Sequence, residues 1–143
     1  MENPSPILIV EDDGDLAEII SCNLTGAGYA VVTAADGLHA LQAFEAAEPR
    51  LVVLDLMLPT ISGFRLIQLF KKLRPGVPVI VATALHFEEA EDAVRAGADD
   101  FVTKPFEPSV IVGKVNHFLD PAAPRPVDLL TANAPTGPMP IAV

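Results

Sequence analysis

The chain has 143 residues and a formal net charge of -10, from 9 lysines and arginines against 19 aspartates and glutamates. This acidic balance argues against direct contact with nucleic acid, because binding to phosphates requires a basic surface. The single cysteine, Cys22, excludes an internal disulfide and a zinc site built from thiolates, and we expect it to be a small core residue. No apolar run approaches the ~20 residues that a membrane span needs, and residues 1–6 do not resemble a signal peptide, so we expect a cytoplasmic protein without membrane insertion.

Apolar segments alternate with segments of helical periodicity along residues 7–119. Strands are expected at residues 7–10, 29–33, 51–54, 77–82 and 101–103. Helices are expected at residues 16–24, 37–48, 64–73, 88–96 and 108–119, with Asp36 as a cap for the second and Gly97 as a stop for the fourth. Strict alternation of this kind predicts a five-stranded parallel sheet with helices on both faces, a doubly wound α/β architecture of three layers.

The character of the sequence changes after residue 120. Six prolines fall within residues 121–143, together with few charges and one short apolar cluster at 127–130. A composition like this does not predict a second packed core. We therefore expect one domain over residues 1–120, followed by a Pro-rich tail over residues 121–143 that is flexible or docked on the surface.

Four of the five predicted strands run directly into residues with definite chemistry. Glu11 and Asp12 come after the first strand and Asp55 after the third, while Thr83 closes the fourth and Lys104 the fifth. Ligands of open α/β sheets bind at the carboxyl ends of the strands, so we expect these side chains to converge there. Taken alone, Asp55 fits a cap of the following turn equally well.

Carboxylates at such close quarters repel one another unless a cation lies between them. Their hard oxygens, with no histidine or cysteine beside them in the sequence, favour Mg²⁺, or else Mn²⁺, over zinc. A lysine and a threonine hydroxyl at the same edge can each bind one oxygen of a phosphoryl group. This set of groups predicts a site for phosphoryl transfer, which depends mainly on positioning and charge neutralisation.

Four segments resemble, in their order and spacing, the receiver domain of response regulators, the flavodoxin-like phosphoacceptor of two-component signalling. They are residues 7–13, residues 54–59 with the following Ser62 and Gly63, residues 81–84 and residues 96–106. The resemblance covers about residues 7–119. It implies a chain that receives a phosphoryl group from a sensor histidine kinase or a histidine phosphotransfer protein. It also implies that the chain is not an enzyme beyond its own phosphorylation and dephosphorylation.

The resemblance implies a role for each acidic or basic residue at this edge. Asp55 is the phosphoacceptor, and Lys104 pairs first with its carboxylate and then with the phosphoryl oxygen. Asp12 and Asp55 ligate Mg²⁺ together with the backbone carbonyl of Met57. Glu11 acts on the metal largely through bound water.

Further roles are implied for the neighbouring positions. The peptide bond between Lys104 and Pro105 is expected to be cis. Thr83 is expected to hydrogen-bond the phosphoryl group, and Phe101 to turn inward behind it as an aromatic switch. Asp13 is expected to cap the first helix and not to ligate the metal.

Phosphorylation would shift a population between two pre-existing states and change the face formed by the fourth helix, fifth strand and last helix. The last helix carries one lysine, Lys114, and no arginine, which favours a single-domain regulator that controls a protein partner. The alternatives are a receiver fragment of a longer regulator and a pseudo-receiver that keeps the fold without phosphorylation. Met57 and Leu85 are apolar and should hinder an attacking water, which predicts a long-lived phosphoryl group.

Two other classes of protein share parts of this pattern. A phosphohydrolase with an aspartyl nucleophile would need a second acid two residues after the nucleophile, where this chain has Met57. A flavodoxin-like electron carrier would need a phosphate-binding loop rich in Ser, Thr and Gly after the first strand. Residues 11–13 are all acidic instead and would repel the flavin phosphate.

Overall fold

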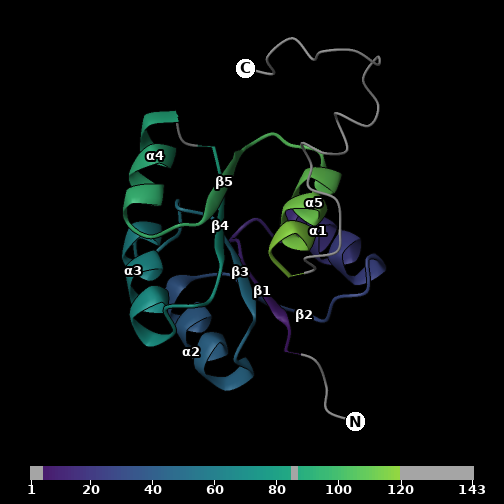
Figure 1. Ribbon diagram of the computed structural model, residues 1–143, viewed down its shortest axis with the longest axis horizontal. Helices are drawn as coiled ribbons and strands as arrows, with labels where there is room; N and C mark the ends of the chain where they lie inside the picture. The colour runs from purple at the N-terminus through teal and green to yellow at the C-terminus, as the bar shows by residue number, and fades with distance from the viewer. Residues whose placement is uncertain (1–4, 85–86, 120–143) are drawn as a thin grey trace.

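The computed structural model describes residues 5–84 and 87–119, without the side chains of residues 87–90, and within these ranges the apolar segments form one β-sheet (Figure 1). Its strands are β1 (Ile7–Val10), β2 (Val31–Ala34), β3 (Leu51–Leu54), β4 (Val79–Thr83) and β5 (Asp100–Thr103). Their order in the sheet is β2-β1-β3-β4-β5, and all neighbours are parallel. The prediction of a five-stranded parallel sheet is confirmed.

Helices cover both faces of this sheet, as Figure 1 shows. They are α1 (Gly14–Gly26), α2 (Gly37–Ala47), α3 (Gly63–Leu73), α4 (Phe87–Arg95) and α5 (Pro108–Leu119). Ile7 and Ile9 of β1 pack with α1 and α5 on one face, whereas Leu8 and Val10 pack with α2 and α3 on the other. Because β1 and β3 are buried on both faces, their apolar runs are continuous and not alternating. The doubly wound, three-layer architecture is therefore also as predicted.

Two strands begin two residues later than the sequence predicts. β2 starts at Val31, because Tyr29 lies in the turn after α1 and its hydroxyl donates to Asn116 Oδ1 of α5. β4 starts at Val79, because the N–H of Val77 donates to the carbonyl of Arg74 and closes the turn that follows α3. In both cases, residues whose side chains favour a strand belong instead to the turn that precedes it.

Cys22 is exposed on α1, so the expectation of a core residue there is wrong. The buried stripe of this helix consists of Ala17, Ile20 and Leu24. A residue two positions after Ile20 lies ~200° further round an α-helix and therefore faces away from the sheet. Ile19 is likewise 47% exposed, which makes the buried stripe narrower than the apolar spacing indicates.

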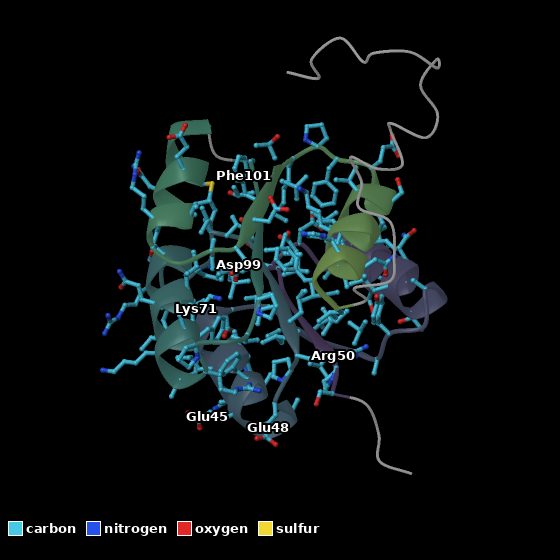
Figure 2. The ribbon with its side chains drawn as sticks, in the orientation of Figure 1. Glu45, Glu48, Arg50, Lys71, Asp99 and Phe101 are labelled. Atoms are coloured by element: carbon cyan, nitrogen blue, oxygen red, sulfur yellow. The ribbon has the colours of Figure 1, made fainter. Side chains whose placement is uncertain are left out.

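Ion pairs hold the edge strand β5 at its start (Figure 2). Asp99 lies directly before β5, and its Oδ2 is 2.6 Å from Lys71 Nζ of α3 and accepts the N–H of Val79 at 2.8 Å. Asp100, the first residue of β5, pairs at 2.8 Å with Lys114 Nζ of α5. These contacts fix the strand whose far end carries Lys104.

No helix within the described ranges is long and apolar enough to cross a membrane. The predicted tail at 121–143 and residue Leu85 lie outside those ranges. The domain boundary at residue 120 and the behaviour of the tail therefore stay predictions.

Candidate functional site

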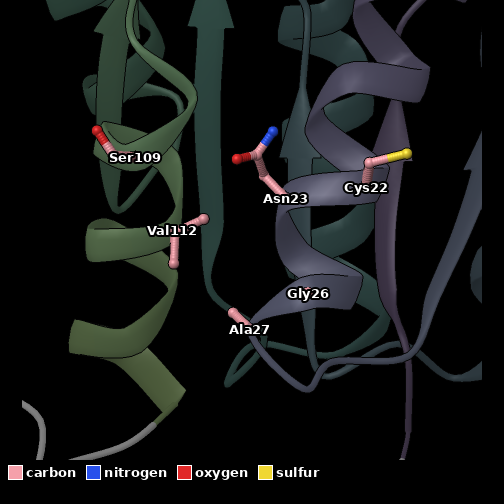
Figure 3. Close-up of a pocket in the computed structure, with 6 residues that line it drawn as sticks. All are labelled: Cys22, Asn23, Gly26, Ala27, Ser109 and Val112. Carbon is pink, nitrogen blue, oxygen red and sulfur yellow. The ribbon is translucent and has the colours of Figure 1, made fainter.

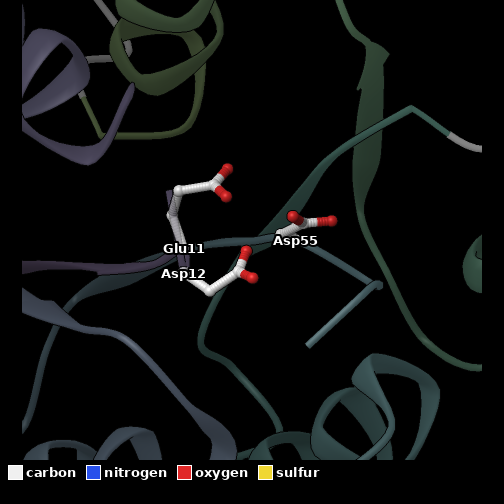
Figure 4. Close-up of side chains that lie close together, drawn as sticks. All are labelled: Glu11, Asp12 and Asp55. Carbon is white, nitrogen blue, oxygen red and sulfur yellow. The ribbon is translucent and has the colours of Figure 1, made fainter. Parts of the chain in front are cut away.

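Three carboxylates meet where β1 and β3 end (Figure 4). Glu11 and Asp12 follow β1 and Asp55 follows β3, and one carboxylate oxygen from each lies within 4.8 Å of the others. The strands are in register at Val10 and Leu54, and the N–H of Asp55 donates to the carbonyl of Val10 at 2.9 Å. Glu11 and Asp55 are buried, at 4% and 5% exposure, while Asp12 faces solvent. The acidic cluster thus has two buried carboxyl groups and one at the protein surface.

Lys104 reaches this cluster from β5, across the intervening strand β4. Its Nζ lies 2.7 Å from Glu11 Oε1 and 3.0 Å from Asp55 Oδ2. Its own N–H donates to the carbonyl of Thr83 at 2.8 Å, which extends the β4–β5 pairing up to the lysine. The peptide bond to Pro105 is cis, as the resemblance implied. The pairing with Asp55 was expected from the sequence, but the pairing with Glu11 was not.

The charges in the cluster do not balance. Burial raises the pKa of the Glu11 carboxyl from 4.5 to about 7, although hydrogen bonds from Lys104 and from the N–H of Asp13 favour its ionised form. Burial also acts to lower the pKa of Lys104, but its hydrogen bonds to Glu11 and Asp55 outweigh this and raise it. The ammonium therefore stays charged, while the Glu11 carboxyl keeps its proton to a higher pH than an ordinary glutamate does. A further cation at this position would replace that proton.

The chemistry of the donors fits a hard divalent cation. Three carboxylates face a single ammonium, which leaves a deficit of two positive charges when all four groups are ionised. All the converging side-chain ligands are oxygens, the type that Mg²⁺ and Mn²⁺ prefer. The acidic cluster can therefore hold such an ion, with Asp12 on its exposed side.

Thr83 and Phe101 lie on the strands beside this cluster. Thr83 ends β4 and is fully buried. Phe101 is half-buried on β5, opposite Val81 in register, and packs against the apolar core on the side of α2, α3 and α4 (Figure 2). Asp13 caps α1, since its Oδ1 accepts the N–H groups of Asp15 and Leu16. The structure shows the positions of these residues, and the predicted roles of Thr83 and Phe101 in switching stay predictions.

The loop of residues 56–62 carries Met57 past the acidic cluster. The Met57 N–H donates to Asp55 Oδ1 at 3.0 Å, and its side chain is 59% exposed. Further along, Thr60 has a φ of 70°, and the N–H of Ile61 donates to the carbonyl of Pro59 at 2.9 Å. This is a tight γ-turn with a β-branched residue in a conformation that such residues rarely adopt. Nothing in the sequence marks this loop as strained.

A separate hollow between α1 and α5 has no comparable chemistry (Figure 3). Its lining consists of Cys22, Asn23, Gly26, Ala27, Ser109 and Val112. This lining contains no aspartate, glutamate, lysine or arginine, and it lies along the last turns of α1 and the start of α5. Among the described residues, the carboxylates that lie close enough together to hold a metal ion are Glu11, Asp12 and Asp55, which makes the acidic cluster the candidate site.

Comparisons with known proteins agree with this placement. Residues 7–116 match the family model of the response regulator receiver domain. The chain is 38% identical over 117 residues to a probable transcriptional regulatory protein, TcrX, of Mycobacterium tuberculosis, covering 81% of this chain and 50% of that one. It is also 38% identical over 118 residues to a probable transcriptional regulator, ycf27, of Cyanophora paradoxa, covering 82% and 49%. The chain thus spans about half the length of the curated relatives it matches.

Solved structures show the same likeness. The BeF3-activated receiver domain of DrrB superposes with a TM-score of 0.75 and 37% identity, covering 82% of this chain and 99% of that one. A CheY-like receiver domain protein of Methanospirillum hungatei gives 0.78 and 32%, covering 83% and 96%. With the family model matching most of its length and the acidic cluster at the expected strand ends, the chain belongs to the response regulator receiver family.

Proposed function

We propose that Asp55 accepts a phosphoryl group from a histidine kinase or a histidine phosphotransfer protein in a Mg²⁺-dependent reaction. One observation carries this proposal: a buried Asp55 carboxylate lies 3.0 Å from a lysine ammonium and within 4.8 Å of two further carboxylates. An oxygen of Asp55 attacks the phosphorus, and the phosphorus–nitrogen bond of the phosphohistidine breaks. The departing imidazole nitrogen keeps the electron pair and takes up a proton. The chain catalyses only its own phosphorylation and dephosphorylation.

The residues around Asp55 would prepare it for this attack. Lys104 holds one carboxylate oxygen and the Met57 N–H holds the other, which fixes the orientation of the nucleophile. Asp12, Asp55 and the Met57 backbone carbonyl would hold Mg²⁺, with Glu11 acting largely through its bound water, and Mn²⁺ suits the same oxygens. When bound, the ion supplies positive charge to the phosphoryl oxygens. Lys104 then transfers its hydrogen bond from the carboxylate to the phosphoryl group.

Thr83 and Phe101 would convert phosphorylation into a change of surface. The phosphoryl group adds roughly -1.5 to -2 charge and three acceptor oxygens. The Thr83 hydroxyl donates to one of them, and Phe101 turns inward behind it. Phosphorylation thereby shifts the populations of two pre-existing conformations of the face formed by α4, β5 and α5. That face controls a protein partner.

Two arrangements of the whole protein are compatible with this receiver function. In the first, this cytoplasmic receiver acts alone and does not touch nucleic acid, which its charge of -10 supports. In the second, it is the receiver of a longer regulator, which the chain's half-length match to proteins named as transcriptional or DNA-binding regulators supports. DNA binding would then belong to the output domain. A pseudo-receiver would lack phosphorylation altogether.

Incubation with Mg²⁺ and acetyl phosphate should add one labile phosphoryl group to the chain, detected by intact-protein mass spectrometry. Asp55→Ala should abolish the adduct, because it removes the nucleophile, and excess EDTA should strongly reduce it. Asp92→Ala is the matched control, since Asp92 is an exposed acid on α4 outside the acidic cluster. An unmodified native chain, or an undiminished adduct in Asp55→Ala, would overturn the assignment.

Mg²⁺ affinity should rise with pH as Glu11 loses its proton. With a pKa of about 7 for Glu11, the affinity measured by isothermal titration calorimetry should be about tenfold weaker at pH 6 than at pH 8. In the metal-free chain, the same group makes unfolding easier as the pH rises from about 4.5 to about 7, because the unfolded carboxyl ionises first. Glu11→Gln should remove both dependences, whereas Glu91→Gln on α4 should keep them. A pH-independent affinity in the native chain would contradict this reading.

Met57→Gln should shorten the life of the phosphoryl group, because the exposed apolar side chain flanks the path of an attacking water. We expect dephosphorylation on the order of tenfold faster, below the ~100-fold that a positioned general base supplies. The decay is followed by mass spectrometry after removal of the phosphodonor. Leu73→Gln, another exposed apolar residue at the far end of α3, should change nothing. Equal lifetimes in Met57→Gln and the native chain would rule out this role.

A further inference from the structure

Three helices begin in the same way, with a glycine directly after a capping side chain. The pairs are Asp13 and Gly14 in α1, Asp36 and Gly37 in α2, and Ser62 and Gly63 in α3. Glycine is a poor helix former, so its presence at these three starts asks for a reason other than propensity. None of the three has a positive φ, so the backbone conformation itself does not require it.

The space around these glycines differs, and the difference points to one loop. A Cβ on Gly14 would meet nothing within 4 Å. A Cβ on Gly37 would lie 2.6 Å from the Cβ of Ile61, and one on Gly63 would lie 2.4 Å from the Cα of Leu56. Such distances are far inside van der Waals contact. The two crowded glycines therefore contact opposite ends of the loop at 56–62.

This loop is held at its ends and strained in its middle. The Asp55 N–H donates to the carbonyl of Val10, and the Gly63 N–H donates to the carbonyl of Leu56 at 3.2 Å. Between them lies the turn at Thr60, whose φ of 70° suits glycine better than a β-branched residue. Strained turns persist only where their surroundings impose them. Ile61 is the next residue, and its half-buried side chain rests on Gly37 and the core under α2.

We propose that Ile61, seated on Gly37, is a positioning residue of the phosphoacceptor site. The contact holds the strained turn and so fixes the course of the loop through Met57, whose N–H orients Asp55 and whose carbonyl is the proposed ligand for Mg²⁺. This inference rests on the proposed function. Because Mg²⁺ demands near-ideal octahedral geometry, a shift of the loop by a fraction of an ångström weakens its binding. The start of α2, remote from the acidic cluster in sequence, thereby helps to set its affinity.

The test is a double-mutant cycle with Mg²⁺ affinity as the readout, measured by isothermal titration calorimetry on the full chain. Gly37→Ala should weaken Mg²⁺ binding about tenfold, because the added methyl group pushes Ile61 away; this is less than the ~100-fold that a 1 Å misplacement can cost a reaction rate. In an Ile61→Gly background the same change should have no further effect, because the colliding side chain is gone. Gly14→Ala is the matched control, with the same position in its helix and open space around it.

A second readout separates positioning from a general loss of structure. In Gly37→Ala, a higher Mg²⁺ concentration should restore most of the phosphorylation rate with acetyl phosphate, whereas a misfolded site would react slowly at every concentration. Far-UV circular dichroism checks that each variant is folded, and Ile61→Gly, which should also weaken Mg²⁺ binding, carries the test if Gly37→Ala does not fold. Unchanged Mg²⁺ affinity in Gly37→Ala, or equal losses in both backgrounds, would overturn the proposal. A native chain that binds Mg²⁺ but takes no phosphoryl group would instead refute the proposed function.

Discussion

The double ion pair of Lys104 with Glu11 and Asp55 is the interaction on which the site depends. Without this ammonium, two carboxylates buried to this extent would repel each other and take up protons still more readily. The fold meets this need by bringing an ammonium from β5 across β4, which requires that β5 be anchored in the sheet. Asp99 and Asp100 provide that anchor through Lys71 and Lys114. Remote surface ion pairs thus serve the site by fixing the strand that delivers its cation.

The sheet and the loops make different contributions to the geometry. The parallel register of β1 and β3 brings Glu11, Asp12 and Asp55 to the same edge of the sheet. Hydrogen bonds between the strands fix the relative positions of their backbones. The backbone of Met57 is placed by the loop at 56–62, which is short, strained at Thr60 and packed on glycines. The regular sheet determines which acidic residues lie together, and the irregular loop determines the distance between Met57 and Asp55. Strain at such a position is typical of functional sites.

The sequence predicted the architecture because its signals there are strong and local. Continuous apolar runs, capping residues and alternation predicted the five-stranded parallel sheet, and the resemblance of four motifs predicted the family; both are confirmed. The boundary of β2 was misplaced, because Tyr29 has a strand-like side chain but lies in the turn after α1, where its N–H donates to the carbonyl of Leu24 and its hydroxyl donates to the distant Asn116. Cys22 was misplaced, because a small apolar residue does not reveal which side of a helix it occupies. The convergence of Glu11, Asp55 and Lys104 was predicted, because each of them follows a predicted strand. The packing of Ile61 against Gly37 is a tertiary contact that no local sequence pattern predicts.

We propose that the groups at these strand ends form one cation-binding phosphoacceptor centre. A titration of the ¹⁵N-labelled chain with Mg²⁺, followed by two-dimensional amide NMR, tests it most directly. We expect saturable shifts that are largest for the amides of residues 11–13, 55–57 and 104, and that are lost in a chain carrying Asp12→Ala and Asp55→Ala together. Shifts that do not saturate, or that appear at Glu91 and Asp92 of α4 with residues 11–13 and 55–57 unaffected, would contradict this proposal.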